Sequence, residues 1–205
     1  YATTNDLSLA VHYSYMQTQM DITNFVNHHV AYIYINAFDW GTNGNNTAIW
    51  RKRTADFAPD APPGQDGRWR WMMFDAGTSF MYPDANTLAR NMGVGPGVVL
   101  FTRLLENSDF RNLVINTFAD QMNSTFRPAR VQQIAESVYQ ELLPELSEHN
   151  GRWAGNIGAP SKTYAEQRPN FMRQHLMAAF NLAGTATLTL AVSHTNQGRI
   201  QINSL

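Results

Sequence analysis

Hydrophobic positions recur at helical spacing along most of the chain, and the clearest run covers residues 21–38. In this segment, DITNFVNHHVAYIYINAF, apolar side chains return every three or four positions, which is the period of one helix face. Its β-branched and aromatic content predicts a buried helix rather than a surface one. Asp21 or Thr23 can cap its first turn. The pattern stops at Asp39, where GTNGNN favours turns.

The same periodicity predicts helices before and after this segment. A short helix is expected over residues 5–18. Later helices are expected over residues 98–107, 108–126, 127–149 and 161–182. Ser108 or Asp109 can cap the second of these later helices. Pro144 should kink or end the third, and Pro169 is expected near the start of the last.

Alternation with a period of two predicts strands in three places. Residues 47–53 (TAIWRKR) and 68–76 (RWRWMMFDA) are expected to pair, and the proline-, aspartate- and glycine-rich segment 54–67 between them is expected to be an exposed loop. TATLTLAVSH and RIQINSL, separated by a turn, predict a β-hairpin in the tail, residues 184–205. The expected class is α+β and predominantly helical, with a helical domain over residues 1–183.

Composition limits the kinds of molecule that are expected to bind this protein. Hydrophobic residues make up 43% of the 205-residue chain and the net charge is −1, so a sizeable core is expected and neither nucleic acid nor an anionic membrane is favoured as a partner. The adjacent basic residues 51–53 leave a local basic patch as an open alternative. No apolar run approaches the roughly 20 residues of a membrane span. The absence of cysteine excludes disulfides, thiolate metal sites and a cysteine nucleophile. The chain begins at Tyr1 without a signal peptide and is interpreted as a piece of something longer.

Two aspartates stand at the edges of apolar segments, where an unpaired carboxylate is rarely buried. Asp39 precedes a polar loop that holds Asn43, Asn45 and Asn46, and Asp75 closes the strand WRWMMFD. Each acid could simply brace its turn through backbone amides. Alternatively, an Asp, a nearby Asn and a second Asp after a strand is the set that protein kinases use to orient a hydroxyl nucleophile and to hold magnesium.

Other candidate chemistry has weaker support. His28 and His29 are adjacent, so their side chains point about 100° apart and make a poor metal pair; hydrogen-bonded core histidines are the better interpretation. GVGPG at residues 93–97 lacks the Lys-Ser/Thr of a phosphate loop and is read as a plain loop. The Arg-Trp-Arg-Trp segment at residues 68–71 could bind sugars or bases, but core packing under arginine stems is favoured.

The motifs DITNF, DW, NN, WR and GRWRW…FD, spread over residues 21–80, together resemble the spore-coat CotH kinase-like family. The likeness continues through LLENSDFRNLVINTFADQMNSTFRPARV, RPNFMRQHL and GRIQINSL, so it covers nearly the whole chain. The resemblance implies an atypical protein-kinase-like fold. It also implies phosphate transfer from ATP to Ser or Thr of a protein substrate, such as a coat or surface protein.

The resemblance assigns roles to particular residues. It implies that Asp39 is the catalytic acid, that Asp75 binds the metal, and that Asn45 or Asn46 is its metal-binding companion. The implied cofactors are ATP and Mg²⁺ or Mn²⁺. The implied location is a bacterial cell surface, a spore coat or the secreted fraction.

Three departures from the family pattern bear on activity. The loop DWGTNGNN is longer than usual, and Gly77 stands where many members have a second acid, which Thr78 or Ser79 would replace only partly. No Gly-rich loop or strand lysine precedes Tyr15, and the first lysine is Lys52. We therefore expect the C-terminal lobe of a kinase-like fold, inactive by itself.

A second function from another class fits the same departures. The chain could be a non-catalytic surface or coat-like interaction module that keeps the kinase-like fold. In either case a lobe without its partner exposes an apolar interface, which an oligomer could cover.

Overall fold

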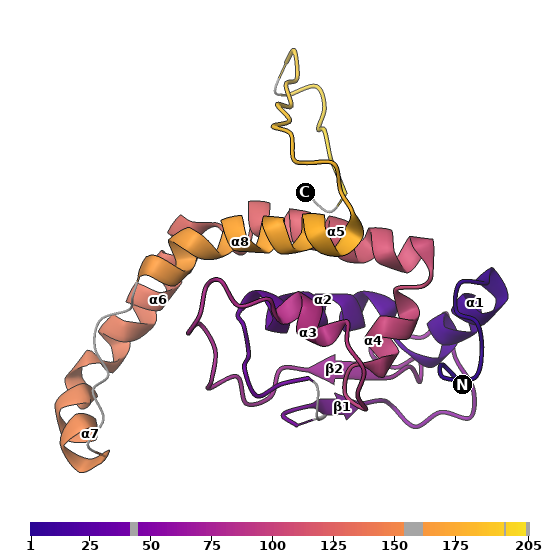
Figure 1. Cartoon of the computed structure of the whole chain (residues 1–205), viewed down its shortest axis with the longest axis horizontal. Coiled ribbons are helices and arrows are strands. Elements are labelled where there is room, and N and C mark those ends of the chain that lie inside the picture. Colours follow the sequence, from indigo (N-terminus) through magenta and orange to yellow (C-terminus); the bar gives the residue numbers. More distant parts are fainter. Residues whose placement is uncertain (42–44, 154–161, 195, 204–205) are drawn as a thin grey trace.

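The structure is a computed structural model of the chain, and it describes residues 1–41, 45–153, 162–194 and 196–203. This part of the protein is predominantly helical and contains a two-stranded antiparallel sheet. The helices and the sheet form a body, from which a helical arm and the C-terminal tail project (Figure 1). The expected α+β, mostly helical class is confirmed.

Helix α2 (Ile22–Tyr34) runs through the centre of the body, between α5 and α8 on one side and the sheet on the other (Figure 1). Most of the helix is buried because its sequence is largely apolar, and the polar Thr23 and Asn27 are exposed on one side. Its buried side chains are Ile22, Phe25, Val26, His28, His29, Val30, Tyr32, Ile33 and Tyr34. The Asp21 carboxylate caps the helix by accepting from the backbone N–H of Asn24 (3.0 Å). The predicted buried helix and its cap are confirmed.

The other helices surround α2. They are α1 (Ala10–Gln19), α3 (Thr87–Asn91), α4 (Val99–Leu104), α5 (Ser108–Asn123), α6 (Pro128–Leu142), the short 3-10 helix η1 (Leu143–Glu145), α7 (Leu146–Trp153) and α8 (Lys162–Phe180). Pro144 interrupts the helical run as predicted, since it lies in η1. The cap of α5 is different from the predicted one: the Asn107 side chain accepts from the backbone N–H groups of Asp109 and Phe110.

The small sheet pairs β1 (Ala48–Trp50) with β2 (Arg70–Met72), and Ile49 lies opposite Trp71. Both strands are shorter than predicted. The Trp71 ring packs edge-on against Phe25 of α2 with 4.6 Å between ring centroids, which ties the sheet to the core. The segment between the strands contains neither helix nor strand, as expected.

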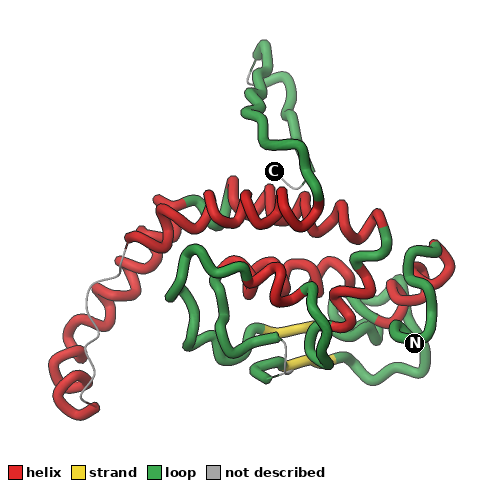
Figure 2. Tube along the Cα trace, viewed as in Figure 1, coloured by secondary structure: helices red, strands yellow, loops and turns green. Residues whose placement is uncertain are grey.

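Three predictions about elements were wrong or incomplete. Pro169 lies inside α8 rather than near a helix start. Helix α3 was not predicted. The described residues of the tail contain no strand, and the tail projects as a loop (Figure 2). Leu188, Leu190 and Val192 are exposed there, and a hairpin without an apolar partner surface is marginal in water.

The described helices are also too short or too polar to cross a membrane, because none contains a sufficiently apolar 18-residue window.

Candidate functional site

The site is built on the turn that follows α2. The chain leaves the helix through Asn36, whose φ of 51° is left-handed, a conformation typical of helix C-termini. The buried Asn36 side chain accepts from the Thr87 hydroxyl (2.6 Å) and donates to the carbonyl of Tyr82 (3.4 Å). These bonds fix the end of α2 against α3 and against the segment before it, so that the next residues leave in a defined direction.

Asp39 lies three residues further on and is joined to the segment after the sheet. Its Oδ1 accepts a short hydrogen bond from the Thr78 hydroxyl. Two backbone bonds hold the segments together: the N–H of Phe38 donates to Thr78 (3.2 Å), and the N–H of Phe80 donates to Ile35 (2.8 Å). The Asp39 carboxylate is exposed, so its second oxygen can face a ligand.

Asp75 is positioned by a buried tyrosine of α2. The Tyr32 hydroxyl accepts from the N–H of Phe74 (2.5 Å) and donates to its carbonyl (2.9 Å). The next residue, Asp75, is exposed and has a φ of 48°, an unusual backbone conformation for a non-glycine residue. Because Thr78 follows three residues later, the turn that carries Asp75 is the same turn that binds Asp39.

The asparagine loop is described only from Asn45 onward. Asn43 falls outside the described residues. Asn46 has a left-handed φ of 54°, and the Asn45 carbonyl accepts from the Thr47 hydroxyl (3.3 Å). Over the described ranges, no group of three or more His, Asp or Glu residues could hold a metal ion. The expected companions of Asp75 are thus described, but no contact with it is shown.

A cation beside Asp39 was missed by the sequence analysis. The half-buried Arg90 of α3 donates from Nη2 to the carbonyl of Ala37 (2.7 Å) and stacks over the Phe38 ring, 5.6 Å from its centroid. Burial lowers the pKa of Arg90, and the nearby Asp39 charge opposes that shift. No sequence motif identified Arg90, because this residue lies on α3, a helix that was not predicted.

Gly41 allows the chain to pass closely over α3. Its φ is 105°, and a Cβ at this position would lie 2.5 Å from Oδ1 of Asn91. A side chain at residue 41 is therefore excluded by both space and backbone conformation. The loop after Asp39 consequently begins from a fixed point on α3.

The comparison with protein-family models matches residues 2–178 to the CotH kinase protein family. The chain belongs to the CotH kinase family. The resemblance seen in the sequence is thereby confirmed. Neither the search of curated proteins nor the search of solved structures gave a match.

Within this CotH family chain, Gly77 lies two residues after Asp75, at the position where the resemblance implied a second acid. A Cβ at residue 77 would lie 3.5 Å from Oδ1 of Asp75, which is ordinary van der Waals contact. A side chain therefore fits at this position. The neighbouring Thr78 hydroxyl, which was considered as a substitute ligand, is already bonded to Asp39.

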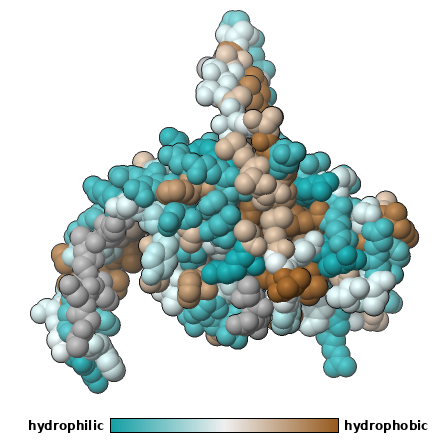
Figure 3. Space-filling model, in the orientation of Figure 1, coloured by the Kyte–Doolittle hydropathy of each residue, from teal (hydrophilic) through white to brown (hydrophobic). Residues whose placement is uncertain are grey.

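Apolar side chains on the segments that carry the two acids, and on the sheet beside them, face solvent. Those on the turn, the sheet and the segment that follows it are Phe38, Ile49, Trp50, Met72, Met73, Phe74, Phe80, Met81 and Tyr82. Brown, hydrophobic surface is visible on the body in Figure 3. Exposed apolar surface of this extent is typical of a binding face.

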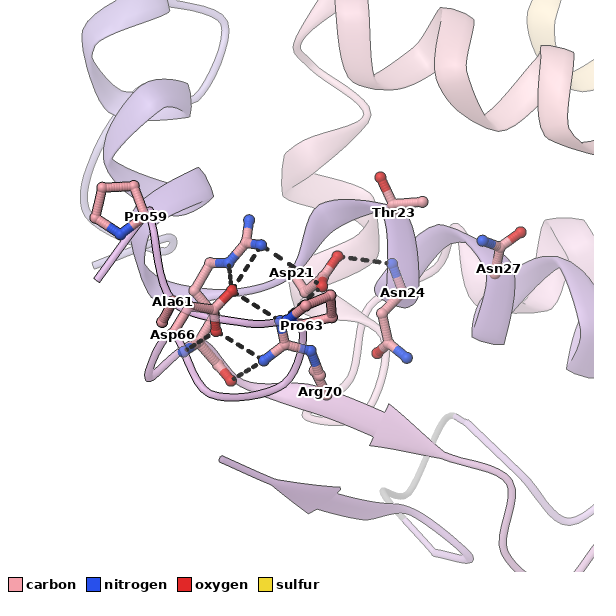
Figure 4. A pocket seen from close by; sticks show the side chains of 10 residues that line it. Asp21, Thr23, Asn24, Asn27, Pro59, Ala61, Pro63, Asp66 and Arg70 are labelled. Atoms are coloured by element: carbon pink, nitrogen blue, oxygen red, sulfur yellow. Dashed lines mark hydrogen bonds and ion pairs between the residues drawn. The ribbon is translucent and has the colours of Figure 1, made fainter. Parts of the chain in front are cut away.

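A polar cleft of about 650 Å³ lies at the opposite end of α2, between its first turns and residues 59–70 (Figure 4). The Arg70 guanidinium makes a bidentate pair with Asp66 (2.8 Å for each bond) and also contacts Asp21 (3.0 Å). This pairing with Arg70 holds the pKa of Asp66 well below its usual range. Arg68 completes the set by bonding Asp66 from Nε (2.8 Å). The four charges balance, so the cluster fastens the loop to α2 and β2.

Proposed function

We propose that this CotH kinase family chain carries the acidic half of a phosphotransfer site, which uses ATP and a divalent metal to modify Ser or Thr of a protein partner. The observation that carries the proposal is the hydrogen bond between Thr78 and Asp39. It joins Asp39, the proposed catalytic acid, to the turn of Asp75 on one solvent-facing surface.

In this proposal Asp39 acts on the acceptor hydroxyl. The bond between the γ-phosphorus and ADP breaks, a bond to the Ser or Thr oxygen forms, and the hydroxyl proton passes to Asp39. Asp39 keeps one oxygen on Thr78, which orients the other oxygen toward the substrate. Arg90 lies beside it and brings a positive charge to this edge of the site.

The donor set suits a magnesium-like ion. Asp75 and either Asn45 or Asn46 offer carboxylate and amide oxygens, and magnesium takes one or two carboxylates and completes its octahedron with water and phosphate. The metal would neutralise charge on the transferring phosphate. With Gly77 in place of a second acid, the affinity of this chain for free metal is expected to be weak.

Calorimetric titration of Mg²⁺ and Mn²⁺, each with and without ATP, tests the proposal. We expect metal binding to be lost in Asp75→Asn and to be unchanged in Asp60→Asn, an exposed acid of the loop. Gly77→Asp should strengthen binding about tenfold or more, because it adds a carboxylate where a side chain fits. Asp39→Asn should keep metal binding, and in a full-length protein that carries both lobes it should abolish phosphate transfer to a protein substrate.

Equal metal affinity in the wild type and in Asp75→Asn would contradict the proposal. It would favour the second candidate function, an interaction module that keeps the fold. Gly77 and the exposed apolar surface support that alternative. Its own signature is partner binding that survives in the Asp39→Ala/Asp75→Ala double variant.

A further inference from the structure

Helix α6 presents an apolar row that nothing in the described structure covers. Ile134, Val138 and Leu142 follow one another at four-residue spacing, and they are 51%, 50% and 47% exposed. No residue of α6 is fully buried. The helix belongs to the arm that leaves the body, which continues into η1 and α7 (Figure 1). Isolated exposed leucines are ordinary, but a row on one helix face is typical of helix pairing.

The contacts of α6 with α8 lie on a different side of the helix. Gln132 donates to the Glu166 carboxylate of α8 (3.1 Å), and Ala135 and Tyr139 are half-buried. At 100° per residue, Gln132 and Tyr139 lie about 100° or more round the helix from Ile134 and Val138, and Ala135 lies at the border of the row, next to Leu142. Helix α8 therefore leaves the exposed apolar row free for another partner.

Charges on the same face have opposite signs at the two ends of the row. Arg127 and Arg130 stand at the start of α6, and Glu141 and Glu145 stand at its end; all four are exposed. Residues seven apart share a helix face, so Arg127, Ile134 and Glu141 lie in one line. Among the described residues, none of the four charges forms an ion pair.

We propose that a second copy of this chain covers the row by antiparallel pairing of α6 with α6. A two-fold axis near the middle of the helix would place Ile134 against Val138 of the partner subunit. The same axis places Arg130 against Glu141 of the partner subunit. Each contact then occurs twice. Parallel pairing would instead bring like charges together, which disfavours it.

The length of the helix sets the strength of the dimer. Fifteen residues span about 22 Å, so the seam is smaller than a standard protein–protein interface. We therefore expect a weak dimer that depends on concentration and salt, because exposed ion pairs are screened.

Charge reversal combined with sedimentation equilibrium tests this pairing on the whole chain. Arg130→Glu alone and Glu141→Arg alone should each weaken self-association about tenfold or more, because like charges then face each other twice per dimer. An equimolar mixture of the two variants should associate again as a heterodimer, and the double variant should self-associate like the wild type. Both changes place charge favourably along the helix dipole, so neither should unfold α6.

Two controls keep the test specific. Glu136→Arg makes the same charge change as Glu141→Arg on the opposite face of α6, and it should leave association unchanged. The chain has no cysteine, so Ile134→Cys mixed with Val138→Cys should form a disulfide-linked dimer on oxidation. A chain that stays monomeric up to its solubility limit overturns the proposal. So does a dimer that is indifferent to the charge reversals.

Discussion

At the scale of single residues, the two adjacent histidines of α2 illustrate how burial determines the protonation state of a side chain. His29 forms a hydrogen bond from Nδ1 to the Phe25 carbonyl (3.0 Å) and stacks on Phe101, as expected of a core histidine. His28 is also buried, but neither of its ring nitrogens bonds a described residue with normal geometry. Burial lowers the pKa of His28 to about 4 and that of His29 to about 3. Both rings are therefore neutral at pH 7.

These low pKa values predict a stability that depends on pH. The unfolded chain binds a proton at each histidine below about pH 6.5, whereas the folded chain does so only near pH 4 or 3. The free energy of unfolding should therefore fall as the pH drops from 6.5 toward 4. Each of the two histidines should contribute about 1.4 kcal/mol per pH unit to this fall. Urea unfolding at several pH values measures this slope. His28→Phe should lower it by about 1.4 kcal/mol per pH unit.

The matched control is His149→Phe, which changes an exposed histidine of α7 and should leave the slope unchanged. A His28→Phe curve that runs parallel to the wild-type curve between pH 6.5 and 4 would contradict the assignment. His28→Phe should also raise stability at pH 7, because it removes a buried polar ring that makes no well-formed hydrogen bond.

At the scale of elements, Arg168 of α8 is the residue that joins helices. It is fully buried and donates to four backbone carbonyls, those of Ile33, Tyr34, Pro83 and Ala85, at 2.6–2.9 Å. Two of them belong to the last turn of α2, where carbonyls lack helical partners and the helix dipole favours a cation. One guanidinium thereby holds α8 to the end of α2 and to the segment that leads from the site to α3.

Removing this guanidinium should cost more than removing an exposed one. Arg168→Met leaves several buried carbonyls unsatisfied and should lower the free energy of unfolding by about 2–4 kcal/mol. Arg168→Lys should recover only part of this, because an ammonium group cannot reproduce the planar fork of donors. Arg111→Met, on the exposed face of α5, should change stability by no more than about 0.5 kcal/mol. Denaturant unfolding of the three variants measures these changes in the free energy of unfolding. Equal losses in Arg168→Met and Arg111→Met would refute the prediction.

Sequence periodicity predicted the long helices because their apolar spacing is itself the signal. It did not predict α3, whose five residues are too few to show a period, nor the continuation of α8 through Pro169, which tertiary packing stabilises. Within the site, Asp39 and Asp75 could be identified as candidates from their residue types and their positions in the sequence. Their connection through Thr78 and the approach of Arg90 could not, since both depend on how segments far apart in sequence pack together.

At the scale of the whole molecule, the body, the arm and the tail differ in how extensively they pack against the core. The family match ends at residue 178, and none of the described residues beyond Leu176 belongs to the buried core. The described tail after Gly184 is almost entirely exposed. One bond back to the body is shown, from Asn203 Nδ2 to Asp120 of α5 (3.1 Å).

Truncation after Thr185 should therefore leave the fold intact. The tail buries little apolar surface, and a single partly exposed hydrogen bond contributes about 0.5–1.5 kcal/mol, so the free energy of unfolding should fall by about 1 kcal/mol or less. Truncation after Leu176 is the matched comparison, because it also removes Ala179 and Phe180, which pack against the core; this shorter chain should lose several times more. Thermal and urea unfolding of the two truncations give both values. If removal of the tail alone destabilised the protein as much as the shorter truncation, the tail would be an integral part of the domain, and the boundary expected at residues 183–184 would be wrong.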